Sequence, residues 1–250
     1  MRAPDWLIAR PIAHRGLHDR ARGVIENMPG AVDAAIAGNF AIEVDIQASA
    51  DNEAMVFHDD DLDRLTTCHG PLAARTADEL KAIRFRDTTE RMMSLSDLCA
   101  RVAGRVPLVI EIKSRFSGDH RLLQRMAEIL CRYDGPAAAM SFDPNLVQAL
   151  RSILPSRPRG IVAERCPDEA DWNSLTPAQR RSMRGLRHAF RSQPHFVAFA
   201  VDQLPAPAPW IARHLFFCPL LAWTVRSPAQ RTHARAHADQ IIFEGFVPPD

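Results

Sequence analysis

The chain has 250 residues, of which 46% are hydrophobic, and its 31 basic and 30 acidic residues give a formal net charge of +1 at pH 7. A chain of this length can bury one large core, and we expect residues 1–250 to form a single domain. The near-zero charge excludes a whole-protein electrostatic attraction for nucleic acid or anionic membranes, so any selectivity for anions must be local.

The five cysteines have neither the paired spacing of a zinc site nor the framework of a secreted disulfide scaffold; they are Cys68, Cys99, Cys131, Cys166 and Cys218. The first ten residues lack the apolar stretch of a secretory signal, and no later segment is apolar enough to span a bilayer. We therefore expect a cytoplasmic protein with reduced thiols and no stable membrane insertion. The sequence carries no signal for an oligomeric state.

In chain order, short apolar strands alternate with helices. After an apolar run that ends at His14, strands are predicted over 40–47, 54–57, 106–113, 137–142, 160–163, 195–201, 220–225 and 240–243. Helices are predicted over 31–37, 76–84, 94–102, 119–133 and 143–154, from 176 onward, and over 209–217 and 227–238. This alternation favours an α/β protein with a (β/α)₈ TIM barrel, in which active sites lie at the carboxyl ends of the strands.

Ionisable residues interrupt or follow several of these apolar runs. Glu43 and Asp45 lie in one run and share a strand face, and Glu111 and Lys113 share a face in another. Burying such charges costs several kcal/mol apiece unless metal, partners or substrate compensate. This placement therefore indicates a site where the side chains converge.

Glu43, Asp45 and Glu111 are candidate metal ligands. An isolated Glu-x-Asp motif more often pairs with arginines, but here the motif lies inside an apolar strand and Glu111 repeats the pattern. Ligands that are all oxygen atoms select a hard divalent cation such as Mg²⁺ or Ca²⁺, and the absence of a Cys and His cluster argues against zinc.

Two histidines differ from the other eight. His14 and His58 each end an apolar run, next to Arg15 and Asp59 respectively. Because imidazoles titrate near neutrality, one can take a proton while the other gives one, and we interpret the two histidines as an acid–base pair. Arg15 and Lys113 either hold phosphate oxygens or merely neutralise the carboxylates.

Other noticeable residues have plainer interpretations. Trp223 is either barrel packing or a platform for substrate, and Glu26 with Asn27 either caps a helix or contacts the site. The arginine-rich segment 180–187 has helical spacing and few aromatic residues, which is typical of a solvated helix face rather than a nucleic-acid interface.

Read together, these motifs resemble the glycerophosphodiester phosphodiesterase family. The matching residues, in order along the chain, are His14-Arg15-Gly16, Glu26-Asn27, Glu43-x-Asp45, Asp51, His58-Asp59, Leu62, Arg64, Glu111-Ile-Lys113, Ser141-Phe142-Asp143 and Trp223-Thr224-Val225. Met28, where the family usually has threonine, and Glu244, near the end of the last strand, depart from the pattern.

The resemblance implies a (β/α)₈ barrel that uses a divalent cation to hydrolyse glycerophosphodiesters to sn-glycerol 3-phosphate and an alcohol. It implies the same metal ligands and acid–base pair as above, with Arg15, Lys113 and Trp223 binding the small-molecule substrate. Which histidine is acid and which is base stays open, as does the choice between a cyclic phosphate intermediate and direct attack by water. A lyase resembling sphingomyelinase D, which stops at the cyclic phosphate, and a non-catalytic phosphodiester-binding barrel are the alternatives.

Overall fold

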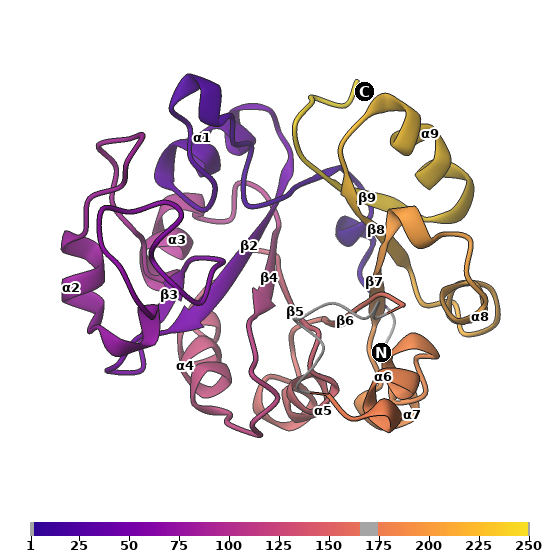
Figure 1. Cartoon of the computed structure of the whole chain (residues 1–250). Coiled ribbons are helices and arrows are strands. Elements are labelled where there is room, and N and C mark those ends of the chain that lie inside the picture. Colours follow the sequence, from indigo (N-terminus) through magenta and orange to yellow (C-terminus); the bar gives the residue numbers. More distant parts are fainter. Residues whose placement is uncertain (1–2, 166–174, 250) are drawn as a thin grey trace. The chain divides into compact units, whose positions relative to one another are not determined.

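The computed structural model describes residues 3–165 and 175–249, so Cys166 lies outside the described residues. These residues form two compact units, one of Ile12–Ala139 and one of Met1–Pro11 with Met140–Asp250. In Figure 1 the first unit runs from indigo to magenta and the second ends in orange and yellow.

The strands of the first unit are arranged around one central strand. They are β1 (Ile12–Ala13), β2 (Ala41–Ala48), β3 (Ala54–Val56) and β4 (Leu108–Ile112). Strands β1 and β4 run parallel to β2, whereas β3 turns back antiparallel along its carboxyl end. Every residue of β2 except the last is buried, as in a strand covered on both faces. The register places Asp45 directly beside Glu111.

The helices of this unit form within a few residues of the predicted ranges. They are α1 (Pro29–Ala37), α2 (Ala77–Ala82), α3 (Leu95–Val102) and α4 (Arg121–Leu130). Thr76 and Ser94 each form a capping box with the acidic residue three positions on, which satisfies backbone N–H groups that would otherwise lack partners. A separate apolar cluster packs beneath the loops after β3 and includes Met28, Met55, Phe57 and Leu62.

The second unit repeats a parallel pattern. Its elements, beginning with a strand that spans the division between the units, are β5 (Ala137–Ser141), α5 (Pro144–Ile153), β6 (Arg159–Ala163), α6 (Pro177–Arg184), α7 (Ala189–Ser192), β7 (Phe196–Ala200), α8 (Pro207–Leu215), β8 (Leu220–Val225), α9 (Pro228–His237) and β9 (Gln240–Phe243). Strands β6 to β9 pair in parallel in chain order. Proline at the first helical position pre-sets the backbone dihedral of α5, α6, α8 and α9.

The observed elements confirm the predicted α/β class and the alternation of parallel strands with helices that defines a (β/α)₈ barrel. Among the residues that are described, no helix is long and apolar enough to cross a membrane. Cys68, Cys99, Cys131 and Cys218 form no disulfide with one another.

Candidate active site

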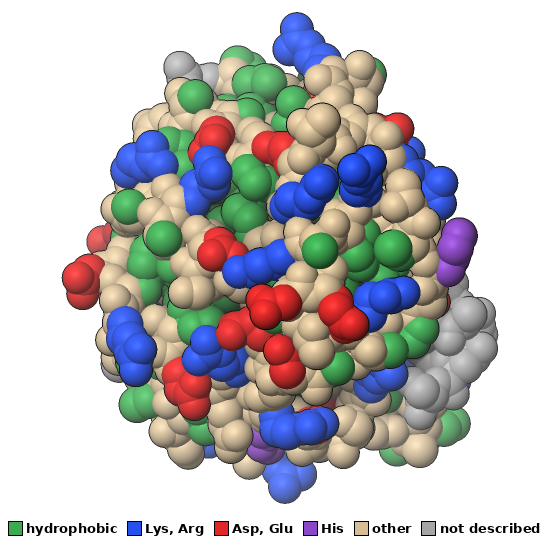
Figure 2. All heavy atoms as spheres, turned by 90° about the vertical axis from the view of Figure 1, so that its left-hand side faces the viewer, with side chains coloured by type: hydrophobic (Ala, Val, Ile, Leu, Met, Phe, Trp, Pro, Cys, Tyr) green, Lys and Arg blue, Asp and Glu red, His purple; other side chains and the backbone are tan. Residues whose placement is uncertain are grey.

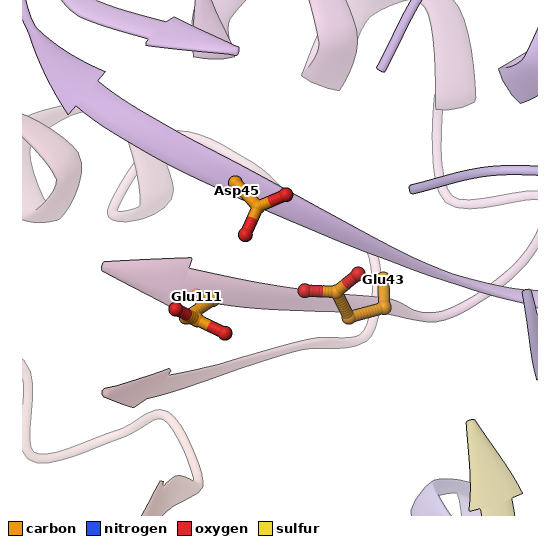
Figure 3. Close-up of side chains that lie close together, drawn as sticks. All are labelled: Glu43, Asp45 and Glu111. Carbon is orange, nitrogen blue, oxygen red and sulfur yellow. The ribbon is translucent and has the colours of Figure 1, made fainter. Parts of the chain in front are cut away.

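Three buried carboxylates converge in the first unit. Glu43 and Asp45 extend from the same face of β2, and Glu111 extends from the neighbouring β4, so that the three side chains point toward a shared space (Figure 3). One oxygen atom from each lies within 4.8 Å of the others. The structure therefore brings together the three predicted metal ligands, which we call the carboxylate trio.

The loop after β1 forms two hydrogen bonds with Glu43. The backbone N–H of Arg15 donates to Glu43 Oε2 over 3.0 Å, and the N–H of Gly16 donates to the Glu43 carbonyl over 3.2 Å. Gly16 has φ of +80°, and a Cβ there would lie 2.9 Å from Ala31. A residue with a side chain would be both strained and crowded, so glycine allows this close approach.

Two cations contact the carboxylate trio. Lys113 Nζ lies 2.8 Å from Asp45 Oδ1 and 2.6 Å from Glu111 Oε1, and Arg15 Nε lies 3.3 Å from Asp45 Oδ2. Lys113 shares a strand face with Glu111, which explains how its ammonium reaches between the two carboxylates. Both predicted phosphate-binding cations are therefore at the site, and both neutralise carboxylates there.

The charges within the carboxylate trio are unevenly compensated. Burial, together with the negative charges of Asp45 and Glu111, raises the pKa of Glu43 well above its usual range. Burial also opposes ionisation of Asp45, but the positive charge of Lys113 and then of the neighbouring histidines and Arg15 holds the pKa of Asp45 well below its usual range. Asp45 is thus ionised, whereas the positive charge near Glu43 is too small to offset its burial and its two acidic neighbours.

This imbalance fits a divalent cation. The carboxylate trio offers only oxygen ligands, and Glu43 Oε1 is buried without a hydrogen-bond partner among the described residues. A buried acceptor without a partner is destabilising, and a hard cation would satisfy it. The residues present therefore fit Mg²⁺ or Ca²⁺ better than a site held together by ion pairs alone.

The two predicted acid–base histidines approach the carboxylate trio from different loops. His14 Nε2 lies 3.9 Å from Glu43 Oε2. His58 follows β3, and the side chain of Gln47 on β2 donates to the carbonyls of His58 and Asp59. Both imidazoles lower the pKa of Asp45, so both act electrostatically on the carboxylate trio.

A chain of charged side chains connects Arg15 to His58. Arg15 Nη1 lies 2.6 Å from Glu26 Oε1, Arg64 bridges Glu26 at 2.7 Å and Asp59 at 2.6 Å, and Asp59 Oδ1 lies 2.8 Å from His58 Nδ1. Although burial opposes it, hydrogen bonding to Arg64 and the charge of Arg15 lower the pKa of Glu26 to about 2. Because the Asp59 carboxylate accepts from Nδ1, Nε2 of His58 is the nitrogen left to exchange a proton with a substrate.

The sequence left Asn27 as either a helix cap or a site contact, and it predicted no role for Gln47. Asn27 Nδ2 donates to Asp45 Oδ2 over 3.1 Å, and the Asp45 N–H points back to Asn27 Oδ1 at 3.4 Å. Asn27 thus orients a carboxylate of the trio rather than capping a helix. Gln47 continues the alternation of Glu43 and Asp45 on the same face of β2, and this period of two is the signal that could have identified it.

The remaining notable residues lie elsewhere. Trp223 is on β8 in the second unit, where its ring packs edge-on against Phe142 with centroids 5.5 Å apart, so its role in substrate binding stays a prediction. Glu244, also in the second unit, accepts from Arg226 Nε at 2.7 Å. Met28 is fully buried in the apolar cluster after β3, so at this departure from the family pattern the side chain contributes to packing.

The chain is similar in sequence to known proteins of one family. The sequence matches the profile of the Glycerophosphoryl diester phosphodiesterase family over residues 14–243. It is 29% identical over 160 residues to a Bacillus subtilis protein named as a glycerophosphodiester phosphodiesterase. That match covers 60% of this chain and 64% of the relative, which is less than two thirds of the relative's length.

Solved structures share the fold. An Oleispira antarctica phosphodiesterase in complex with the product sn-glycerol 3-phosphate is similar with a TM-score of 0.76 and 18% identity, over 95% of this chain and 93% of that one. A Thermotoga maritima glycerophosphodiester phosphodiesterase gives 0.69 and 20%, over 93% and 92%. An Agrobacterium tumefaciens glycerophosphodiester phosphodiesterase gives 0.67 and 23%, over 93% and 95%. These likenesses confirm the (β/α)₈ barrel.

Proposed function

Because the chain belongs to the glycerophosphoryl diester phosphodiesterase family, we propose that it hydrolyses glycerophosphodiesters to sn-glycerol 3-phosphate and an alcohol with the help of a divalent cation. The observation that carries this proposal is the carboxylate trio with one buried, unsatisfied oxygen on Glu43. We further propose that residues 1–250 act as one catalytic domain, since the family profile matches 14–243 as a single region. The scattered cysteines favour a cytoplasmic location.

Glu43, Asp45 and Glu111 would hold the cation, which when bound polarises a phosphoryl oxygen and neutralises charge that develops at phosphorus. Arg15 and Lys113 are the cations of this chain that can contact the remaining phosphate oxygens. Their donors are fixed before substrate arrives, and such preorganised charge stabilises a transition state without later rearrangement.

His14 and His58 carry the proton transfers in this proposal. One nitrogen removes a proton from the attacking hydroxyl and the other donates a proton to the departing alcohol oxygen. His58 presents Nε2 because Asp59 holds its Nδ1, and the chain of Arg64 and Glu26 fixes Asp59 in turn. In this proposal the substrate is held on one side by cations and flanked by two imidazoles that can exchange protons.

The test is the release of glycerol 3-phosphate from glycerophosphocholine and glycerophosphoethanolamine in Mg²⁺, in Ca²⁺ and in chelator. We expect turnover that needs one of the two ions and is restored when that ion is added back. Phosphorus NMR identifies the products: a persistent cyclic phosphate would reassign the protein as a lyase, and binding without turnover would make it a non-catalytic barrel.

A further inference from the structure

The second unit carries an unusual concentration of exposed apolar side chains. Among the described residues, all exposed large hydrophobic side chains except Val247 fall between residues 190 and 217; they are Phe190, Trp210, Ile211, Leu215, Phe216 and Phe217. We call these six residues the apolar patch. Single exposed apolar residues are common, but a contiguous group of them on a folded protein indicates an interaction surface.

Helix α8 has its apolar side turned outward. Pro209 is the only one of its residues that is buried, whereas Ile211 and Leu215, four positions apart, share an exposed face. Its charged residue, Arg213, is turned toward the protein instead, where Nε and Nη2 contact the Asp239 carboxylate at 2.9 to 3.0 Å. A helix at the surface of a soluble domain ordinarily has the opposite arrangement.

A groove joins α8 to the segment around α7. It encloses about 380 Å³ and is lined on one side by Leu186, Arg187 and Phe190 and on the other by Ile211 and Phe216. Figure 1 shows α6, α7 and α8 close together in the orange part of the chain. The two parts of the apolar patch, although some twenty residues apart in sequence, therefore belong to one surface.

The border of this surface is positively charged. Arg181, Arg184, Arg187 and Arg191 are exposed, and none of them forms an ion pair within the part of the chain that the structure describes. The sequence has no Asp or Glu from residue 175 to 200 or from 203 to 238. By contrast, the face of the molecule in Figure 2 carries acidic and basic side chains interspersed.

We propose that the apolar patch and the arginines beside it dock the protein peripherally on a lipid surface with anionic headgroups. Aromatic and aliphatic side chains insert between the headgroups and acyl chains, while the arginines pair with lipid phosphates and other anionic groups. A second copy of the chain fits less well, since a two-fold interface through this surface would bring Arg187 and Arg191 of both copies into one contact area, and residues 175–200 supply no carboxylate to pair with them. A nucleic acid bound here would place the apolar side chains of Ile211 and Leu215 against its polar sugar–phosphate backbone, which is unfavourable.

The experiment is flotation of the full-length protein with vesicles of phosphatidylcholine alone and vesicles of phosphatidylcholine mixed with phosphatidylglycerol. We expect binding to the mixed vesicles, weakening as salt is raised, and little binding to phosphatidylcholine alone. The Phe216→Ser/Phe217→Ser and Arg187→Glu/Arg191→Glu double variants should each lower the partition coefficient about tenfold or more. A blue shift of tryptophan emission on binding should be lost in Trp210→Phe.

Two matched controls separate the surface from general changes in polarity or charge. Val247→Ser alters an exposed apolar residue outside the apolar patch, and Arg132→Glu reverses an exposed arginine in the first unit. Both should bind vesicles like the unaltered protein. Far-ultraviolet circular dichroism and thermal unfolding show whether each variant is folded. Flotation measures binding alone, so the result does not depend on the proposed catalytic function.

The proposal would be overturned by equal binding to both vesicle types, or by no binding to either. It would also be overturned by a dimer that forms with concentration and is lost in the Phe216→Ser/Phe217→Ser variant, which would assign the surface to a second copy. Retention of a single-stranded oligonucleotide in place of vesicles, abolished by Arg187→Glu/Arg191→Glu, would assign it to nucleic acid.

Discussion

The two units of the chain treat buried titratable groups differently. In the first, Asp45 is buried yet kept ionised by contact with Lys113 and Arg15. In the second, burial lowers the pKa of His188 to about 4, and burial with the nearby charge of Arg159 lowers that of His195 to about 4. These two imidazoles are neutral at physiological pH.

This difference distinguishes buried polar residues that indicate a functional site from those that serve packing. The imidazole of His188, whose Nδ1 lies 3.3 Å from Ser192 Oγ, is neutral and so carries no charge for a ligand to balance, although its Nε2 is buried without a hydrogen-bond partner among the described residues. A group of carboxylates with too few cations is costly unless a ligand completes it. The surfaces differ as well, because the second unit exposes the apolar patch together with arginines such as Arg187 and Arg191, which form no ion pair with the described residues.

The largest predicted effect separates the histidines of the site from a matched pair outside it. His14→Ala and His58→Ala should each lower turnover by about 10²- to 10⁴-fold, because each removes a proton transfer from the transition state. His69, which is exposed and contacts Asp63 at 2.6 Å much as His58 contacts Asp59, supplies the control. His69→Ala should leave turnover unchanged; equal losses in all three variants would contradict the assignment.

Removal of the lysine ammonium should change two measurements in opposite directions. Lys113→Met should lower kcat/KM by roughly 10- to 100-fold, since a charged contact to phosphate is lost. The same variant should bind the divalent cation more tightly, because a cation that contacts Asp45 and Glu111 is gone. Calorimetric titration with the metal and steady-state kinetics measure the two effects, and weaker metal binding would show that Lys113 supports the site instead of competing for it.

A smaller effect is expected from Arg64, which we interpret as a positioning residue. Arg64→Gln should lower kcat by about tenfold with little change in KM, because Asp59 is then held less firmly against His58. Loss of a residue that supports a functional group commonly has an effect of this size. The Nδ1 proton resonance of His58 should shift or broaden, a change that mere loss of stability would not produce. The control is Arg121→Gln, which breaks an equally close but exposed pair with Asp119.

The smallest effect concerns stability. The pKa of Glu43 is raised by folding, so its contribution to stability is fully present below its ordinary value and is lost as pH rises through the raised value. In chelator, the free energy of unfolding should therefore fall with rising pH by roughly 1 to 3 kcal/mol, the usual cost of an unsatisfied buried group. Glu43→Gln should remove this slope in urea unfolding, and a slope that persists in the variant would have to come from another group.

Much of the fold could be predicted because local signals and tertiary structure agree. The helices predicted over 94–102 and 143–154 form as α3 and α5, and the period of two in β2 places Glu43 and Asp45 on one face. The alternation of strands and helices also predicts parallel pairing, and β2 pairs in parallel with β4.

Other features depend on contacts between distant residues and on the backbone. Arg15 and Asn27 have φ of 54° and 60°, a left-handed conformation that neither residue type dictates, and this conformation accompanies the contacts of Arg15 with Glu43 and of Asn27 with Asp45. The periodicity of residues 209–217 predicts a helix correctly but cannot tell which side faces the protein. An apolar stripe is normally assigned to the core, and in α8 that assignment would be wrong.

The most direct test of the carboxylate trio is calorimetric titration of the metal-free protein with Mg²⁺ and Ca²⁺, alongside Glu43→Gln and Glu128→Gln, the latter an exposed glutamate of α4. We predict one divalent ion bound per chain in the unaltered protein and in Glu128→Gln, and loss of that binding in Glu43→Gln. Equal binding in all three proteins, or full hydrolytic activity in chelator, would contradict the account.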